Sequence, residues 1–193
     1  MNTYQTPWMD EELTLFRDSI AKFYAAEMAP HEPRWQKQGH VDRDFWLKAG
    51  EMGLLCASVP EEYGGMGGDF RHEAVIVTGA VSCLWCVRVW QCAFTDLRRL
   101  YPGIRYGSAE TALVAGMANG ELVSAIAMTE PGTGSDLQAI KTTAKADGDG
   151  YVINGSKTFI TNGQQADLII LVTKTNRNWF PRYLAVCPGN QRP

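Results

Sequence analysis

The sequence predicts an α+β fold, with an all-α helical domain over residues 1–121 followed by the first part of a β-barrel-like domain over residues 122–193. Two observations lead to this division. In the first part, apolar residues recur at helical spacing behind acidic residues that can cap a helix. In the second part, an Asn-Gly pair between β-branched and aromatic residues, and a later aliphatic run, are typical of strands.

The composition is that of an ordinary globular protein, because 45% of the 193 residues are hydrophobic and the formal net charge is only -3. A chain with this charge is not expected to bind nucleic acid through a basic surface. The longest mostly apolar stretch, residues 74–87, is too short for a membrane span. Residues 1–12 contain no Lys or Arg, so we expect no secretory signal and a cytoplasmic protein.

The five cysteines predict neither disulfides nor a metal site. Their number is odd and no secretory context favours pairing. Cys83 and Cys86 form a Cys-x-x-Cys pair, but no second Cys or His pair follows at zinc-finger spacing. We therefore assign no metal ligand.

The first predicted helix begins after Asp10, which can cap it, and carries Glu11 and Glu12 in its first turn. Pro30 and Pro33 are expected to end it. Its apolar face comprises Leu13, Phe16, Ile20, Phe23 and Tyr24.

Two further helices are predicted in this part of the chain. Asp42 can cap a helix that Gly53 ends, and Asp69 can cap the next one. The linker between them, residues 56–69, is rich in glycine and is not expected to form a regular element. The apolar residues of the middle helix are Phe45, Trp46 and Ala49.

The densest chemical signal lies in residues 126–163. Residues 129–136 read Thr-Glu-Pro-Gly-Thr-Gly-Ser-Asp, a loop that offers backbone N–H groups and hydroxyls. Residues 151–161 predict a β-hairpin that turns at Asn154-Gly155, and residues 168–172 predict another strand. Such a loop facing a hairpin suits a flat polar heterocycle. On the pattern alone, a surface turn beside an ordinary hairpin is the alternative.

Three stretches of the sequence, each taken as a whole, resemble the acyl-CoA dehydrogenase family. They are Thr-Glu-Pro-Gly-x-Gly-Ser-Asp at 129–136, Asn-Gly-x-Lys-x-Phe-Ile-Thr-Asn at 154–162, and Val-Pro-Glu-Glu-Tyr-Gly-Gly-x-Gly-x-Asp at 59–69. The resemblance extends over most of the chain, and its wording is most similar to long-chain and related bacterial members. It implies a helical N-terminal domain over residues 1–121 and a partial middle β domain over residues 122–193.

The resemblance implies that the loop and the hairpin hold FAD. Ile126, Met128 and Thr129 would line the isoalloxazine, and Gly134 and Ser135 would contact the flavin pyrophosphate or the acyl-CoA. The ring would be covered by Phe159, Ile160 and Thr161, with Thr161 near N5, the atom whose electronics neighbouring donors tune. The implied reaction is α,β-dehydrogenation of an acyl-CoA thioester, with electrons passed to an electron-transfer flavoprotein.

In the family, the catalytic base is a glutamate of a C-terminal helical domain, whose bundle also forms the homo-oligomer. We expect this chain to be truncated before that domain, so it has no catalytic residue to assign and is not expected to dehydrogenate acyl-CoA alone. Glu130 belongs to the flavin loop by the family pattern. Two alternatives stay open: a catalytically inactive remnant with at most residual flavin binding, and a related flavin oxidase or monooxygenase.

Three segments depart from the family pattern: residues 79–103, 111–116 and 176–193. Codons permitted by these residues can be chosen so that a neighbouring reading frame encodes family-like strings. We interpret the three segments as family sequence translated in the wrong frame. The codons of the gene test this hypothesis.

Overall fold

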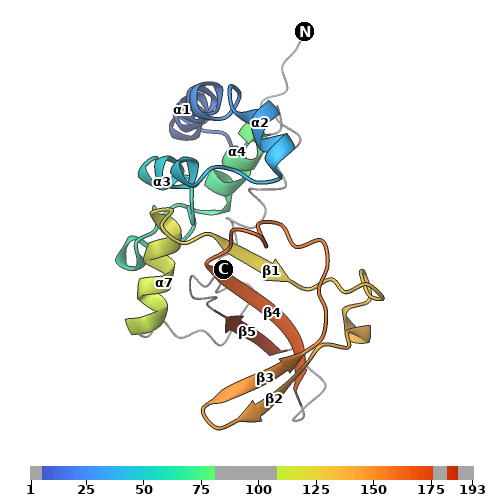
Figure 1. Ribbon diagram of the computed structural model, residues 1–193. Coiled ribbons are helices and arrows are strands. Elements are labelled where there is room, and N and C mark those ends of the chain that lie inside the picture. Colours follow the sequence, from blue (N-terminus) through green and yellow to red (C-terminus); the bar gives the residue numbers. More distant parts are fainter. Residues whose placement is uncertain (1–5, 81–107, 176–181, 187–193) are drawn as a thin grey trace. The chain divides into compact units, whose positions relative to one another are not determined.

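The computed structural model describes residues 6–80, 108–175 and 182–186 (Figure 1). The chain divides into two compact units, Met1–Glu121 and Leu122–Pro193. Most of the departing segments 79–103 and 176–193 lies outside the described residues, so the reading-frame hypothesis stays a prediction about the gene. In the part that is described, no helix is long and apolar enough to cross a membrane.

Helix α1, Glu11–Glu27, begins where the sequence predicts. The Asp10 carboxylate accepts a hydrogen bond of 2.8 Å from the Leu13 amide, which satisfies one of the amides that the first turn leaves without a helical partner. Most residues of the predicted apolar face are buried, and these are Leu13, Ile20, Phe23 and Tyr24. Phe16, the remaining residue of that face, is half-buried. The prediction of this helix is confirmed.

A short helix, α2 at Glu32–Gln38, follows and was not predicted. Pro33 lies in its first turn, where the missing amide hydrogen has no helical partner to lose. The proline therefore begins a helix here, whereas the sequence pattern predicts only that it ends one. The helix buries Trp35.

Helix α3, Arg43–Glu51, has the predicted position, but its predicted cap is wrong. The Asp42 side chain makes no capping hydrogen bond, because its carboxylate accepts hydrogen bonds from the Arg34 guanidinium at 3.0 Å and the Gln38 amide at 2.9 Å. The C-terminal prediction is confirmed, since Gly53 adopts a left-handed φ of 66° just after the helix.

The glycine-rich linker contains one 3-10 turn, η1 at Glu61–Tyr63, so the prediction of no regular element there is wrong for these residues. Helix α4, Phe70–Ala80, follows Asp69, whose carboxylate accepts a 2.8 Å hydrogen bond from the Arg71 amide as predicted. Helix α7, Ser108–Ala118, completes the described part of this unit.

The described residues of the second unit form a five-stranded sheet in which β4, Leu168–Thr175, pairs with three other strands (Figure 1). Strand β1, Ser124–Ala127, runs parallel to the first half of β4, and β2, Thr143–Asp147, runs parallel to its last two residues. Strand β5, Arg182–Val186, is antiparallel to β4. The predicted strand 168–172 is confirmed as the start of β4.

The predicted hairpin about Asn154-Gly155 is wrong. The observed hairpin pairs β2 with β3, Gly150–Asn154, and turns at Gly148 and Asp149. β3 ends at Asn154, which pairs with Thr143, and the chain leaves the sheet beyond it. Gly155 lies so close to Thr142 that a Cβ on Gly155 would be 2.3 Å from the Thr142 hydroxyl. Where the sequence predicts the second strand of the hairpin, the chain instead contacts the loop, for example through the hydrogen bond from the Thr158 amide to the Thr129 carbonyl.

Candidate functional site

The polar loop, residues 128–142, lies between two strands that both run parallel to β4. β1 ends at Ala127 beside Leu171, and β2 begins at Thr143 beside Lys174. A single turn of 3-10 helix, η2 at Leu137–Ala139, is its only regular element in the described structure. Pairing with β4 therefore places the two ends of the loop close together, and the loop needs contacts of its own to fix the chain between them.

The Glu130 carboxylate provides these contacts. One oxygen, Oε2, accepts a hydrogen bond from the Lys141 amide at 2.7 Å. The other, Oε1, accepts from the Thr142 amide at 2.9 Å and the Thr142 hydroxyl at 2.6 Å. The start of the loop is thus bonded to its end, and the carboxylate occupies the space that the loop encloses.

Lys157 completes the cluster from a distant part of the sequence. Its Nζ lies 2.9 Å from Glu130 Oε1, and the two side chains are 9% and 6% exposed. Burial raises the pKa of the Glu130 carboxyl, but the hydrogen bonds from Thr142, Lys141 and Lys157 outweigh burial and lower this pKa to about 2. A carboxylate with so low a pKa is a weak proton acceptor, and its oxygens already accept four hydrogen bonds, so the geometry favours a structural role for Glu130 over that of a general base.

Two more hydrogen bonds join the loop to residues 157–161. Lys157 Nζ donates to the Met128 carbonyl at 2.8 Å, and the Thr158 amide donates to the Thr129 carbonyl at 3.0 Å. The structure therefore brings two of the eight predicted site residues, Met128 and Thr129, beside the segment that carries three others, Phe159, Ile160 and Thr161.

An open cavity of about 600 Å³ lies on the side of this segment, and Phe159 and Ile160 contribute to its wall. Phe159 is 91% exposed and has a left-handed φ of 56°. The lining is mostly apolar and comes from the sheet and from the segment after β3, with Ala127, Ile153, Ile169, Leu171, Lys157, Thr158, Gly163 and Gln164 as its other members.

The predicted site residues do not all face this cavity. Ile126 precedes Ala127 on β1, and successive strand residues point to opposite faces, so Ile126 points away from the face on which Ala127 lines the cavity. Gly134 and Ser135 lie in the exposed part of the loop, and a Cβ built on Gly134 would have no neighbour within 4 Å. None of the eight is buried; they are Ile126, Met128, Thr129, Gly134, Ser135, Phe159, Ile160 and Thr161.

Sequence reasoning missed the cluster of Glu130, Thr142 and Lys157. Glu130 belongs to the family-like stretch at 129–136, and Lys157 belongs to the one at 154–162. Neither stretch indicates that these two side chains, 27 positions apart, bind each other. No group of three or more His, Cys, Asp or Glu side chains within residues 6–80, 108–175 and 182–186 is arranged to hold a metal ion.

Comparison with known proteins agrees with the resemblance in the sequence. Residues 10–121 match the acyl-CoA dehydrogenase N-terminal domain, and residues 125–187 match the acyl-CoA dehydrogenase middle domain. The chain is 43% identical over 168 residues to the mitochondrial long-chain specific acyl-CoA dehydrogenase of Sus scrofa, which covers 86% of this chain but 39% of that relative. The chain thus spans well under half of the length of this curated relative.

Solved structures show the same similarity. A crystal structure of acyl-CoA dehydrogenase from Geobacillus kaustophilus superposes with a TM-score of 0.84 at 39% identity, over 95% of this chain and 50% of that one. An acyl-CoA dehydrogenase from Bacillus anthracis, complexed with FAD, also gives a TM-score of 0.84, at 29% identity, over 95% of this chain and 32% of that one. With both domain matches placed in order along the sequence, the chain belongs to the acyl-CoA dehydrogenase family.

Proposed function

We propose that this chain supplies the flavin-facing part of an FAD-dependent oxidoreductase that dehydrogenates the α,β bond of an acyl-CoA thioester. In this proposal residues 1–121 are the N-terminal helical domain and residues 122–193 are part of the middle β domain, a division that the two compact units support. The observation that carries the proposal is the hydrogen-bonded junction of the Thr129 loop with residues 157–161, in a chain of this family.

The residues present fit a planar cofactor. A phenylalanine that is 91% exposed with a left-handed backbone is unfavourable both in hydration and in conformation. Such outliers occur where a ligand covers the side chain or the strain is part of a site. Thr129 and Thr161 are only half-buried residues, so their side chains leave room for contact with a polar ring edge.

The roles follow from these positions. Phe159 and Ile160 would cover the flavin ring, Thr129 and Thr161 would donate hydrogen bonds to its polar atoms, and Met128 would contact it beside Thr129. Ile126 points to the opposite face of β1 from the cavity, so this proposal assigns it no contact with the ring. When bound, FAD supplies the hydride acceptor, while these side chains bind and orient it.

The exposed loop is the second contact region of the proposal. Gly134 has open space around it, so a phosphate can approach the backbone closely, and the Ser135 hydroxyl can donate to it. The group bound there would be the flavin pyrophosphate or the acyl-CoA. Electron-transfer flavoprotein as the electron acceptor and a homo-oligomeric assembly complete the proposal, and both rest on family membership.

The roles assigned to Thr129 and Thr161 are contacts with the flavin, so the test is flavin binding rather than turnover. Titration of the purified chain with FAD, followed by flavin fluorescence, measures a dissociation constant. In the Thr129→Ala, Thr161→Ala double variant, loss of hydrogen bonds to a buried ligand edge should weaken binding by about 1 to 3 kcal/mol for each hydroxyl that bonds the flavin.

Ser156→Ala is the matched control, because Ser156 is an exposed hydroxyl of the same segment with no assigned role. It should leave the affinity unchanged. Equal FAD affinity in the unsubstituted chain and the double variant would contradict the assignment of both threonines.

A further inference from the structure

We propose that Glu130 and Lys157 are positioning residues for the flavin site, acting as a buried clamp that holds the Thr129 loop against the segment carrying Phe159, Ile160 and Thr161. The proposal rests on the proposed function for its ligand. Lys157 contributes to the cavity wall, but its ammonium group bonds Met128 and Glu130, so the pair acts through the residues that it holds.

The clamp grips three consecutive residues of the loop. Lys157 Nζ binds the Met128 carbonyl at 2.8 Å and the Glu130 carboxylate at 2.9 Å, and the Thr158 amide binds the Thr129 carbonyl at 3.0 Å. All three contacts come from two adjacent residues, Lys157 and Thr158. The position of Thr129 is therefore determined by the same two residues that lead into Phe159.

The Glu130 side chain connects the clamp to the far end of the loop. Its four hydrogen bonds come from Lys141, Thr142 and Lys157, so one carboxylate joins the start of the loop, the end of the loop and the 157–161 segment. Hydrogen bonds to an ionised group in a buried place are stronger than those between neutral groups, and they fix geometry more closely.

The backbone of Phe159 shows why such a clamp is needed. A left-handed φ at a bulky residue persists only where the surrounding structure holds it. Phe159 directly follows the clamped residues Lys157 and Thr158, and on its other side the Gly163 amide bonds the Ile160 carbonyl at 3.0 Å. With its side chain largely exposed, Phe159 has little packing of its own to keep it in place.

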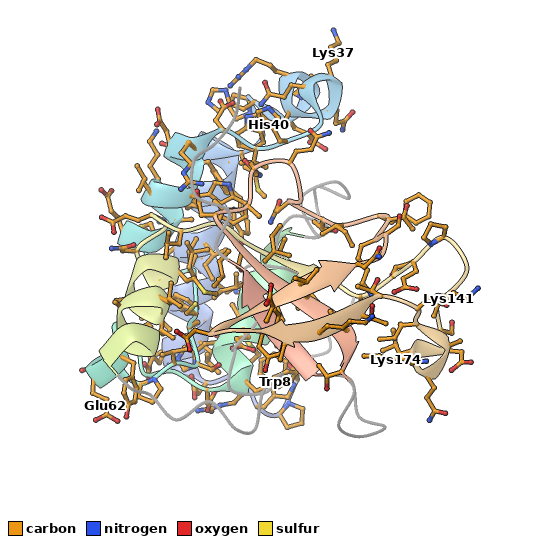
Figure 2. All side chains as sticks on the ribbon, turned by 60° about the horizontal axis from the view of Figure 1, so that its bottom comes forward. Trp8, Lys37, His40, Glu62, Lys141 and Lys174 are labelled. Atoms are coloured by element: carbon orange, nitrogen blue, oxygen red, sulfur yellow. The ribbon has the colours of Figure 1, made fainter. Side chains whose placement is uncertain are left out.

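The test compares Lys157→Met and Glu130→Gln with the control Lys141→Met. Figure 2 shows the Lys141 side chain extending away from the ribbon, and it is exposed, whereas its amide binds Glu130. The control thus removes a neighbouring lysine side chain and keeps every contact of the clamp.

The first measurement is amide hydrogen exchange in the chain without FAD. In Lys157→Met, the exchange rate of the Thr158 amide hydrogen should rise about tenfold or more. The reason is that the Thr158–Thr129 hydrogen bond opens more often once the contacts of the Lys157 ammonium group are lost. Exchange at Asp167, whose amide bonds the Val123 carbonyl at 2.8 Å elsewhere in the same unit, should not change. An equal rise at both amides would mean that the pair only stabilises the unit, which would overturn the proposal.

The second measurement is FAD affinity. Lys157→Met and Glu130→Gln should each raise the dissociation constant about tenfold, and Lys141→Met should not. Unchanged affinity in the first two variants would overturn the proposal. If Lys157→Met fails to fold, the Glu130→Gln, Lys157→Met double variant leaves no charge buried without a partner and allows the same comparison.

These measurements separate this proposal from the proposed function. If the unsubstituted chain binds no FAD, the proposed function fails, and the role in flavin binding fails with it. The exchange pattern at Thr158 and Asp167 then still decides whether the pair clamps the two segments. If FAD binds and only the exchange pattern is wrong, the proposed function stands and the clamp does not.

Discussion

Lys157 Nζ and Glu130 Oε1 lie 2.9 Å apart in side chains that are both less than a tenth exposed. Such a pair differs from the exposed ion pairs of the helical unit, such as Arg17 with Asp18, whose side chains are 52% and 56% exposed and contribute little. A buried pair is costly to break, because the remaining charge stays out of water without a partner. Stability and acid response should therefore depend on this pair more than on any exposed pair.

We expect Lys157→Met to lower the free energy of unfolding by about 3 to 5 kcal/mol, because it leaves the Glu130 carboxylate buried without its cation. Urea unfolding measures this change. Lys141→Met should stay within about 0.5 kcal/mol of the unsubstituted chain, because that side chain is exposed. Similar losses in both variants would show that burial of the pair is not the cause.

The same carboxylate predicts an acid dependence of stability. Its pKa falls from the usual 4.5 to about 2 in the folded chain, so the unfolded state binds the proton more readily. The stabilisation is therefore fully present above about pH 4.5 and is lost as the pH falls toward 2. Unfolding free energies of the unsubstituted chain and Glu130→Gln should converge over this window, and a difference that stays constant from pH 6 to pH 2.5 would contradict the shift.

Asp10 provides a test of capping in the helical unit. Asp10→Ala should lower the free energy of unfolding by about 1 kcal/mol, since the Leu13 amide loses its acceptor. Asp10→Asn is the control, because it keeps the acceptor oxygen and removes only the charge that faces Arg71 at 3.2 Å in an exposed pair. If urea unfolding shows that Asn costs as much as Ala, the ion pair and not the cap is responsible.

Gly155 tests the close approach of the chain to Thr142 just beyond β3. In Gly155→Ala the new Cβ would lie 2.3 Å from the Thr142 hydroxyl and 2.7 Å from Thr142 Cα, so the chain must shift. We expect a loss of about 1 to 3 kcal/mol in urea unfolding. Gly132→Ala, at a glycine with nothing within 4 Å, should be nearly neutral. A neutral Gly155→Ala would mean that Thr142 can move away freely.

The sequence alone determined the features that depend on neighbours within a turn or two. The caps at Asp10 and Asp69, the glycine end at Gly53 and the aliphatic strand at 168–172 each arise from local backbone needs, and the structure has all four. The family could also be identified from the sequence, because its strings are long and specific. A prediction from local sequence is wrong where one residue type can either end a helix or begin one. Pro33 is such a case, because it was expected to end a helix and instead lies in the first turn of α2.

Tertiary structure decided what the polar loop and the segment after β3 do. Asn154-Gly155 has the local chemistry of a hairpin turn, yet Asn154 ends a strand that pairs with β2, and the Thr158–Thr129 hydrogen bond holds the following residues against the loop. The clamp likewise joins Glu130 to Lys157 across 27 residues, and only the paired strands around β4 bring those residues together. The physical reason is that a buried charge pairs with whichever opposite charge the folded chain places next to it. Neither local propensity nor the spacing of residues in the sequence specifies which residue that will be.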